Sequence, residues 1–78
     1  MFSLREVCIG VGGMTSGHDA GEIEEGLRHK RGVLSASVDL SSSSVVVAFD
    51  PSSVTAAYLV QGVRALGYEA EVLRPGGA

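Results

Sequence analysis

Several residues of types that could bind a metal ion lie in one short stretch of this 78-residue chain. Ser16, His18 and Asp19 follow one another closely, and Met14 comes just before them. An imidazole suits zinc and copper, a carboxylate prefers hard cations, and soft sulfur ligands suit Cu(I). The stretch from Met14 to Asp19 is therefore the first place to look for a metal site.

The donors of this stretch do not form a good chelate. His18 and Asp19 are adjacent, and adjacent side chains on a helix point in different directions. The sequence favours His18 as a solvent-exposed side chain. Weak binding of Zn or Cu(II) by His18 and Asp19 is kept as an alternative hypothesis, with Met14 as a further weak candidate ligand.

The single cysteine, Cys8, offers neither a disulfide nor a Cys-x-x-Cys motif. Its place in a predicted strand puts it on the sheet face turned away from Met14 to Asp19, so we interpret it as a small packed residue. No nucleophile–base pair and no converging pair of carboxylates is recognisable. We therefore expect no enzymatic activity and no bound cofactor.

Composition excludes several other classes of function. The formal net charge of −3 argues against binding to nucleic acid, whose phosphates favour a basic surface. No apolar run approaches the ~20 residues that a membrane span needs, and the N-terminus does not have the pattern of a signal peptide. The sequence predicts a cytoplasmic domain without direct membrane insertion, monomeric when isolated.

Along the rest of the chain, the spacing of apolar residues predicts six elements. Alternation predicts strands, and a recurrence at i, i+3 and i+7 predicts helices. The predicted ranges are strand 4–11, helix 17–30, strand 33–40, strand 45–50, helix 55–66 and strand 68–73. This βαββαβ order predicts an α+β fold, a ferredoxin-like open-faced sandwich with a four-stranded antiparallel sheet and two helices on one face. We expect one domain over residues 1–74 and a linker or tail over 75–78.

The second face of this sheet has no predicted cover. Alternation places Cys8, Val46 and Ala48 there, and none of these residues is aromatic. An RNA-recognition module would need aromatic side chains on this face to stack bases, so that function is disfavoured. A small apolar patch of Cys8, Val46 and Ala48 keeps open the alternative of a protein-interaction module.

Several short motifs occur in one order along the chain, and each is weak when taken alone. They are Gly13-Met14-Thr15, Ile23-Glu24, Gly32-Val33, Asp50-Pro51 and Gly67-Tyr68. Together, at these intervals, the sequence resembles the heavy-metal-associated domain family. This family includes copper chaperones and the N-terminal modules of heavy-metal P-type ATPases.

The resemblance also identifies what is missing. The family pattern Gly-Met-Thr-Cys-x-x-Cys would place its two metal-binding cysteines where this chain has Ser16 and Asp19. It further implies that Met14 packs inward and that Tyr68 closes over the loop. Neither replacement reproduces a thiolate pair for Cu(I). We expect Ser16 and Asp19 instead to cap free N–H groups at the helix start.

The resemblance therefore implies a degenerate module of a copper or heavy-metal transport or detoxification protein. Its metal binding would be lost or weak, limited to Cu or Zn, and its role would be docking or regulation. Its partners would be another protein or other domains of a parent transporter, and it would belong to the cytosolic part of such a transporter.

Overall fold

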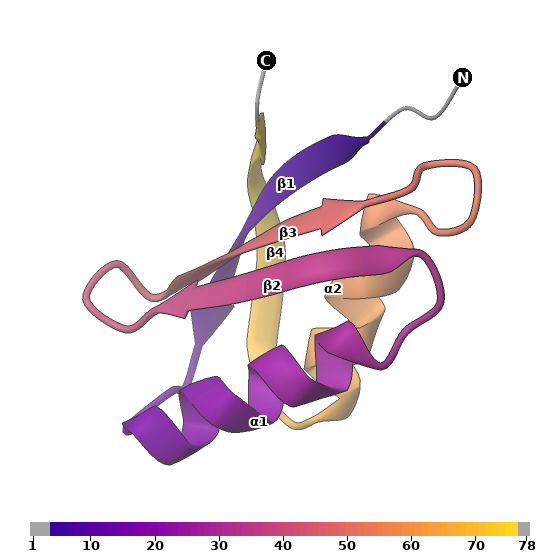
Figure 1. Cartoon of the computed structure of the whole chain (residues 1–78). Coiled ribbons are helices and arrows are strands. Elements are labelled where there is room, and N and C mark those ends of the chain that lie inside the picture. Colours follow the sequence, from indigo (N-terminus) through magenta and orange to yellow (C-terminus); the bar gives the residue numbers. More distant parts are fainter. Residues whose placement is uncertain (1–3, 77–78) are drawn as a thin grey trace.

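The computed structural model describes residues 4–76, and the chain forms the predicted βαββαβ order (Figure 1). The elements are β1 (Arg5–Gly12), α1 (Gly17–Arg28), β2 (Val33–Asp39), β3 (Ser44–Phe49), α2 (Ala56–Ala65) and β4 (Glu69–Gly76). No helix among residues 4–76 is long and apolar enough to cross a membrane.

The four strands form one antiparallel sheet in the order β2-β3-β1-β4. β3 and β1 are the two inner strands, and the two outer strands are β2 and β4. Both helices pack on the same side of the sheet, so the ferredoxin-like prediction is confirmed (Figure 1). This arrangement brings the end of β1, the start of α1 and the start of β4 to one end of the domain.

Alternation along the strands supplies the core between the sheet and the helices. Val7, Ile9 and Val11 of β1 are each no more than 3% exposed, as their spacing predicts. Ile23 and Leu27 of α1 meet them from the helical side and are almost fully buried. A core this small depends on each of these residues, because a short chain buries only a modest share of its surface.

Each helix is followed by a glycine whose backbone conformation other residues rarely adopt. Gly32 has a φ of 90° and Gly67 a φ of 102°. A residue without a Cβ takes this conformation at little steric cost, so the chain can reverse into β2 and β4 immediately after each helix. Helix α1 ends at Arg28, two residues before the predicted end, because the turn that leads to Gly32 begins at His29.

Strand β4 also differs from its predicted range, because it continues past Leu73 to Gly76. Pro75 pairs with Val7 and Gly76 pairs with Glu6, so the first two residues of the predicted tail extend the sheet. The composition of this segment suggested a linker, but β1 is long enough to offer it a partner. Proline is tolerated here because β4 is an edge strand. The rest of the predicted tail, residues 77–78, lies outside the described residues.

Candidate functional site

The loop between β1 and α1 is held by the carboxylate of Asp19. One oxygen of this carboxylate, Oδ2, accepts hydrogen bonds from the backbone N–H of Thr15 at 2.8 Å and from the Thr15 hydroxyl at 2.9 Å. Asp19 lies in the first turn of α1, so its negative charge also complements the helix dipole. The carboxylate thus ties the loop back onto the helix that follows it.

Tyr68 reaches the same carboxylate from the other end of the sequence. Its hydroxyl lies 3.0 Å from Oδ1 of Asp19 and 2.7 Å from Oε1 of Glu22. A phenol has one proton to donate, so the two carboxylates share it. The ring of Tyr68 packs against the core and lies beside Gly13 in the loop. Tyr68 therefore lies against the loop between β1 and α1.

The hydrogen bonds of this network change the acidity of its members. The backbone and hydroxyl donors of Thr15 are the main reason that the pKa of Asp19 lies below its ordinary value, with a smaller contribution from Tyr68. The pKa of Tyr68 is raised, first by its hydrogen bond to Glu22 and then by partial burial and by Asp19. At neutral pH the structure therefore holds an ionised Asp19 and a neutral Tyr68.

Ser16 has a different place from the one expected of a capping residue. It occupies the N-cap position of α1, but its side chain makes no capping hydrogen bond. Its backbone carbonyl accepts the N–H of Ala20 at 3.3 Å. Asp19 turns toward Thr15 rather than toward the free N–H groups of the helix. The expectation that Ser16 and Asp19 cap these N–H groups is therefore wrong, because Asp19 anchors the preceding loop instead.

The remaining candidate ligands near the loop do not converge. His18 is exposed, and its influence on Asp19 is only electrostatic. Met14 is half-buried and packs against the core. Within residues 4–76 no group of three or more histidine, cysteine or acidic residues is arranged to hold a metal ion. The structure thus brings Asp19 together with Tyr68 and leaves His18 and Met14 apart from them.

The open sheet face differs in part from the predicted patch. Cys8 is only 6% exposed, because it lies in the central strand with neighbours on both sides. It therefore cannot contribute much surface, whereas Val46 is 40% exposed and Ala48 is half-buried. Leu73, 52% exposed, lies over Gly10 on this face and enlarges its apolar area.

Leu73 was not part of the apolar patch predicted from the sequence, although it lay in the last predicted strand. The register between β1 and β4 shifts between Cys8 and Ile9, and this bulge leaves Leu73 without a paired residue on β1. Counted from the buried Ala70, alternation still places Glu71 and Leu73 on the open face, so the bulge changes the pairing of Leu73 and not the face it occupies. Gly10 is a further signal in the sequence, because a glycine inside a strand often marks a close approach of another group.

The sequence of the chain is similar to those of proteins that handle copper. Residues 9–69 match the family model of the heavy-metal-associated domain. The chain belongs to this family.

The relatives include free chaperones and domains of transporters. The copper chaperone CopZ of Enterococcus hirae is 38% identical over 63 residues, which cover 81% of this chain and 91% of the chaperone. A copper-transporting ATPase of Arabidopsis thaliana is 36% identical over 70 residues. That match covers 90% of this chain but only 7% of the ATPase, so this chain corresponds to a small part of that protein.

Solved structures agree with this assignment. A copper-binding domain of a P-type ATPase has a TM-score of 0.90 at 33% identity, with 92% of this chain and 97% of that domain covered. The N-terminal domain of a potential copper-translocating P-type ATPase from Bacillus subtilis, in its Cu(I)-loaded state, has a TM-score of 0.90 at 25% identity. That match covers 97% of this chain and 95% of the other.

The residues of the loop do not fit Cu(I). Soft Cu(I) is bound by sulfur ligands, but this chain has a hydroxyl at Ser16 and a carboxylate at Asp19. Both oxygens of the carboxylate already accept hydrogen bonds, from Thr15 and from Tyr68. A metal ion at Asp19 would therefore compete with these donors for the lone pairs of the carboxylate. The donor set and the hydrogen bonds both oppose a Cu(I) site of the kind that a pair of thiolates makes.

Proposed function

We propose that this domain is a metal-silent module of a copper or heavy-metal transport or detoxification protein, with a docking or regulatory role in place of Cu(I) carriage. The observation that carries the proposal is the occupation of the Asp19 carboxylate by donors of Thr15 and Tyr68. The loop reaches a closed arrangement with its own side chains. It does not need an ion to bring its two ends together.

The chemistry of Asp19 explains how such a loop keeps its shape. A carboxylate is ionised at neutral pH, so it supplies a permanent negative charge at the start of α1, where the helix dipole favours one. A pair of thiolates with one bound Cu(I) would carry a similar net negative charge at this position. The replacement thus conserves the electrostatics of the loop while it removes the affinity for a soft cation.

The family suggests the setting in which such a module would act. We infer a cytoplasmic domain, without catalytic activity, that acts beside other domains of a parent transporter or binds a separate protein. Named relatives include the copper chaperone of Enterococcus hirae and a copper-transporting ATPase of Arabidopsis thaliana. As an isolated domain, it would be a monomer that includes β4 as far as Gly76.

The first experiment is a Cu(I) competition titration of the reduced protein against a chromophoric chelator. The native chain is compared with a double variant, Ser16→Cys with Asp19→Cys, and with each single variant. We expect one equivalent of Cu(I) to be removed from the chelator only by the double variant. Far-UV circular dichroism verifies that each variant is folded, since Asp19→Cys also removes the bonds from Thr15. Tight one-to-one binding by the native chain would refute the proposal.

A separate experiment tests the alternative hypothesis that His18 and Asp19 bind Zn or Cu(II) weakly. His18 is the only part of that site which the structure leaves free of competing contacts, since Asp19 is engaged by Thr15 and Tyr68. The metal-silent proposal predicts equal, negligible heats when Zn is added to the native chain and to His18→Ala in a calorimeter. Binding by the native chain that His18→Ala abolishes would establish the alternative instead.

The docking role is tested with a copper chaperone as the probe. The isotope-labelled domain is mixed with a Cu(I)-loaded chaperone of this family and followed by amide NMR spectra. The proposal predicts chemical-shift changes confined to one surface, with all copper still on the chaperone. Val46→Lys places a positive charge on the open sheet face, and Ser35→Lys on the same face serves as its control. Loss of the chemical-shift changes in Val46→Lys alone would show that the chaperone docks on this face at Val46. Transfer of copper to the domain would contradict the proposal.

A further inference from the structure

The two outer strands of the sheet present polar backbone groups that no strand within residues 4–76 pairs. Exposed edges of this kind are templates for another strand, and proteins usually blunt them. β2 and β4 are the edges here, because the sheet order is β2-β3-β1-β4. In each case a charged side chain of the neighbouring helix reaches the outward side of the edge strand.

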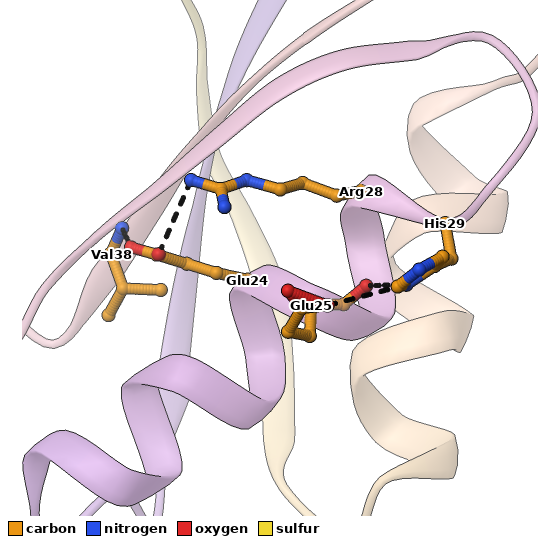
Figure 2. Close-up of polar contacts among 5 residues, drawn as sticks. All are labelled: Glu24, Glu25, Arg28, His29 and Val38. Atoms are coloured by element: carbon orange, nitrogen blue, oxygen red, sulfur yellow. Dashed lines mark hydrogen bonds and ion pairs between the residues drawn. The ribbon is translucent and has the colours of Figure 1, made fainter.

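On the β2 edge this side chain is Glu24 of α1 (Figure 2). Its Oε2 accepts the backbone N–H of Val38 at 2.9 Å, and its Oε1 lies 3.6 Å from Nη2 of Arg28, one turn further along the helix. The Glu24 side chain is only 28% exposed. Since β3 pairs the other side of β2, the Val38 N–H that bonds to Glu24 is an outward-facing donor.

The next residue, Glu25, provides a natural comparison. It also lies four residues before a basic partner, and its Oε2 is 3.6 Å from Nδ1 of His29. Figure 2 shows this pair directed along the helix and away from the strand. Glu25 and His29 are 65% and 79% exposed, so this pair is a surface contact and Glu24 alone reaches the sheet.

On the β4 edge the corresponding side chain is Arg64 of α2. Its Nε and Nη2 donate to the backbone carbonyl of Ala70 at 3.1 and 2.8 Å. Because β1 pairs the other side of β4, this carbonyl is an outward-facing acceptor. The two edges of the sheet are therefore covered in complementary ways. On β2 the Glu24 carboxylate accepts from an outward backbone N–H, and on β4 the Arg64 guanidinium donates to an outward backbone carbonyl.

We propose that Glu24 and Arg64 are edge guards that prevent a second copy of this chain from adding to the sheet. β1 runs antiparallel to both β3 and β4, and β3 runs antiparallel to β2, so β2 and β4 are antiparallel to each other. Translation of one copy beside another would thus align β4 of the first with β2 of the second in antiparallel orientation. The donor at Val38 and the acceptor at Ala70 are complementary.

The antiparallel relation of β2 and β4 determines what kind of assembly the two side chains would prevent. A contact between β2 of one copy and β4 of the next is heterologous, so it leaves a free β2 and a free β4 at the two ends of every assembly. Such contacts build open chains rather than closed dimers. An unguarded domain would therefore be expected to associate progressively with concentration.

The first test measures hydrogen exchange of the Val38 amide, with the Ile9 amide of the central strand as a reporter of global opening. Glu24→Ala should accelerate exchange at Val38 relative to Ile9 by about tenfold or more, the factor for loss of a hydrogen bond to a charged acceptor. Glu25→Ala, the matched control, should leave this ratio unchanged. Glu24→Gln keeps an acceptor and should stay near the native ratio. Equal ratios in all variants would overturn the proposal.

The second test is sedimentation velocity over a wide range of protein concentration. The native chain and Glu25→Ala should sediment as monomers, and the double variant of Glu24→Ala with Arg64→Ala should form species that grow with concentration. A double variant that is folded, exchanges faster at Val38 and yet stays monomeric would overturn the guard role. Glu24 would then only stabilise the packing of α1 on β2.

Discussion

The two glycines that follow the helices should differ in their tolerance of a side chain, although their backbones are alike. Gly32→Ala and Gly67→Ala each place a Cβ on a residue with φ near +90° to +102°. This shared conformation should cost about 1–2 kcal/mol in the free energy of unfolding. A comparison of the two variants therefore cancels the backbone contribution and leaves the effect of the surroundings.

The surroundings are different at the two positions. A Cβ on Gly67 would meet nothing within 4 Å, but one on Gly32 would lie 2.8 Å from Cβ of Ser53 and 3.1 Å from Cγ1 of Val54. Overpacking of this kind costs about 1–3 kcal/mol. We therefore expect Gly67→Ala to lose about 1–2 kcal/mol and Gly32→Ala about 2–5 kcal/mol when the two contributions add.

Urea unfolding followed by circular dichroism measures both values, provided that the m-value stays constant. A domain of this size should lose roughly 4–8 °C in Tm for each kcal/mol. Ser53→Gly removes the nearest atom, so in a double-mutant cycle it should restore part of the loss in Gly32→Ala and none in Gly67→Ala. Equal losses in the two alanine variants would refute the reasoning from the close contact.

Three further predictions concern the helix starts and the loop. Thr55→Ala should lower the free energy of unfolding by about 1 kcal/mol, because the Thr55 hydroxyl caps α2. Ser16→Ala should lower it little, because the Ser16 side chain makes no capping hydrogen bond. Thermal unfolding of the two variants measures the difference. The pKa of Asp19 is lowered in the folded state, so its contribution is present above its ordinary pKa of 3.8 and is lost as the pH falls through the folded value. Asp19→Asn should therefore flatten the acid side of the stability curve, as measured by urea unfolding across pH, and an unchanged acid limb would contradict this. An ultraviolet titration should show one tyrosine whose pKa lies well above the ordinary 10.0. The absorbance change of this tyrosine should be absent in Tyr68→Phe and should occur at lower pH in Glu22→Gln. If Tyr68→Phe retains the change, the perturbed phenol is not that of Tyr68.

Local patterns in the sequence were sufficient for the fold. The alternation of Val7, Ile9 and Val11 and the glycines at 32 and 67 report short-range constraints, so the order and the approximate bounds of the elements could be predicted. The extension of β4 to Gly76 could not, because it depends on how much of β1 is available as a partner.

The site was less predictable, for a related reason. The loss of both ligand cysteines is visible from the identities of residues 16 and 19 alone. The direction of the Asp19 side chain is not, because Thr15 and the helix N–H groups compete for the same carboxylate and only the folded loop decides between them. The contact between Glu24 and Val38 spans fourteen residues and depends on the docking of α1 beside β2.

The closure of the loop by Asp19 has a consequence for oxidation. A Cys-x-x-Cys loop can be oxidised to a disulfide or to sulfur oxyacids, and either change would alter its shape and its charge. Here the loop is held by the oxygen and nitrogen atoms of Thr15, Asp19, Glu22 and Tyr68. The single thiol of the chain, Cys8, is buried in the central strand. The loop should therefore keep one conformation in air and in the presence of reductant, and a surface that docks through it would give the same response in both.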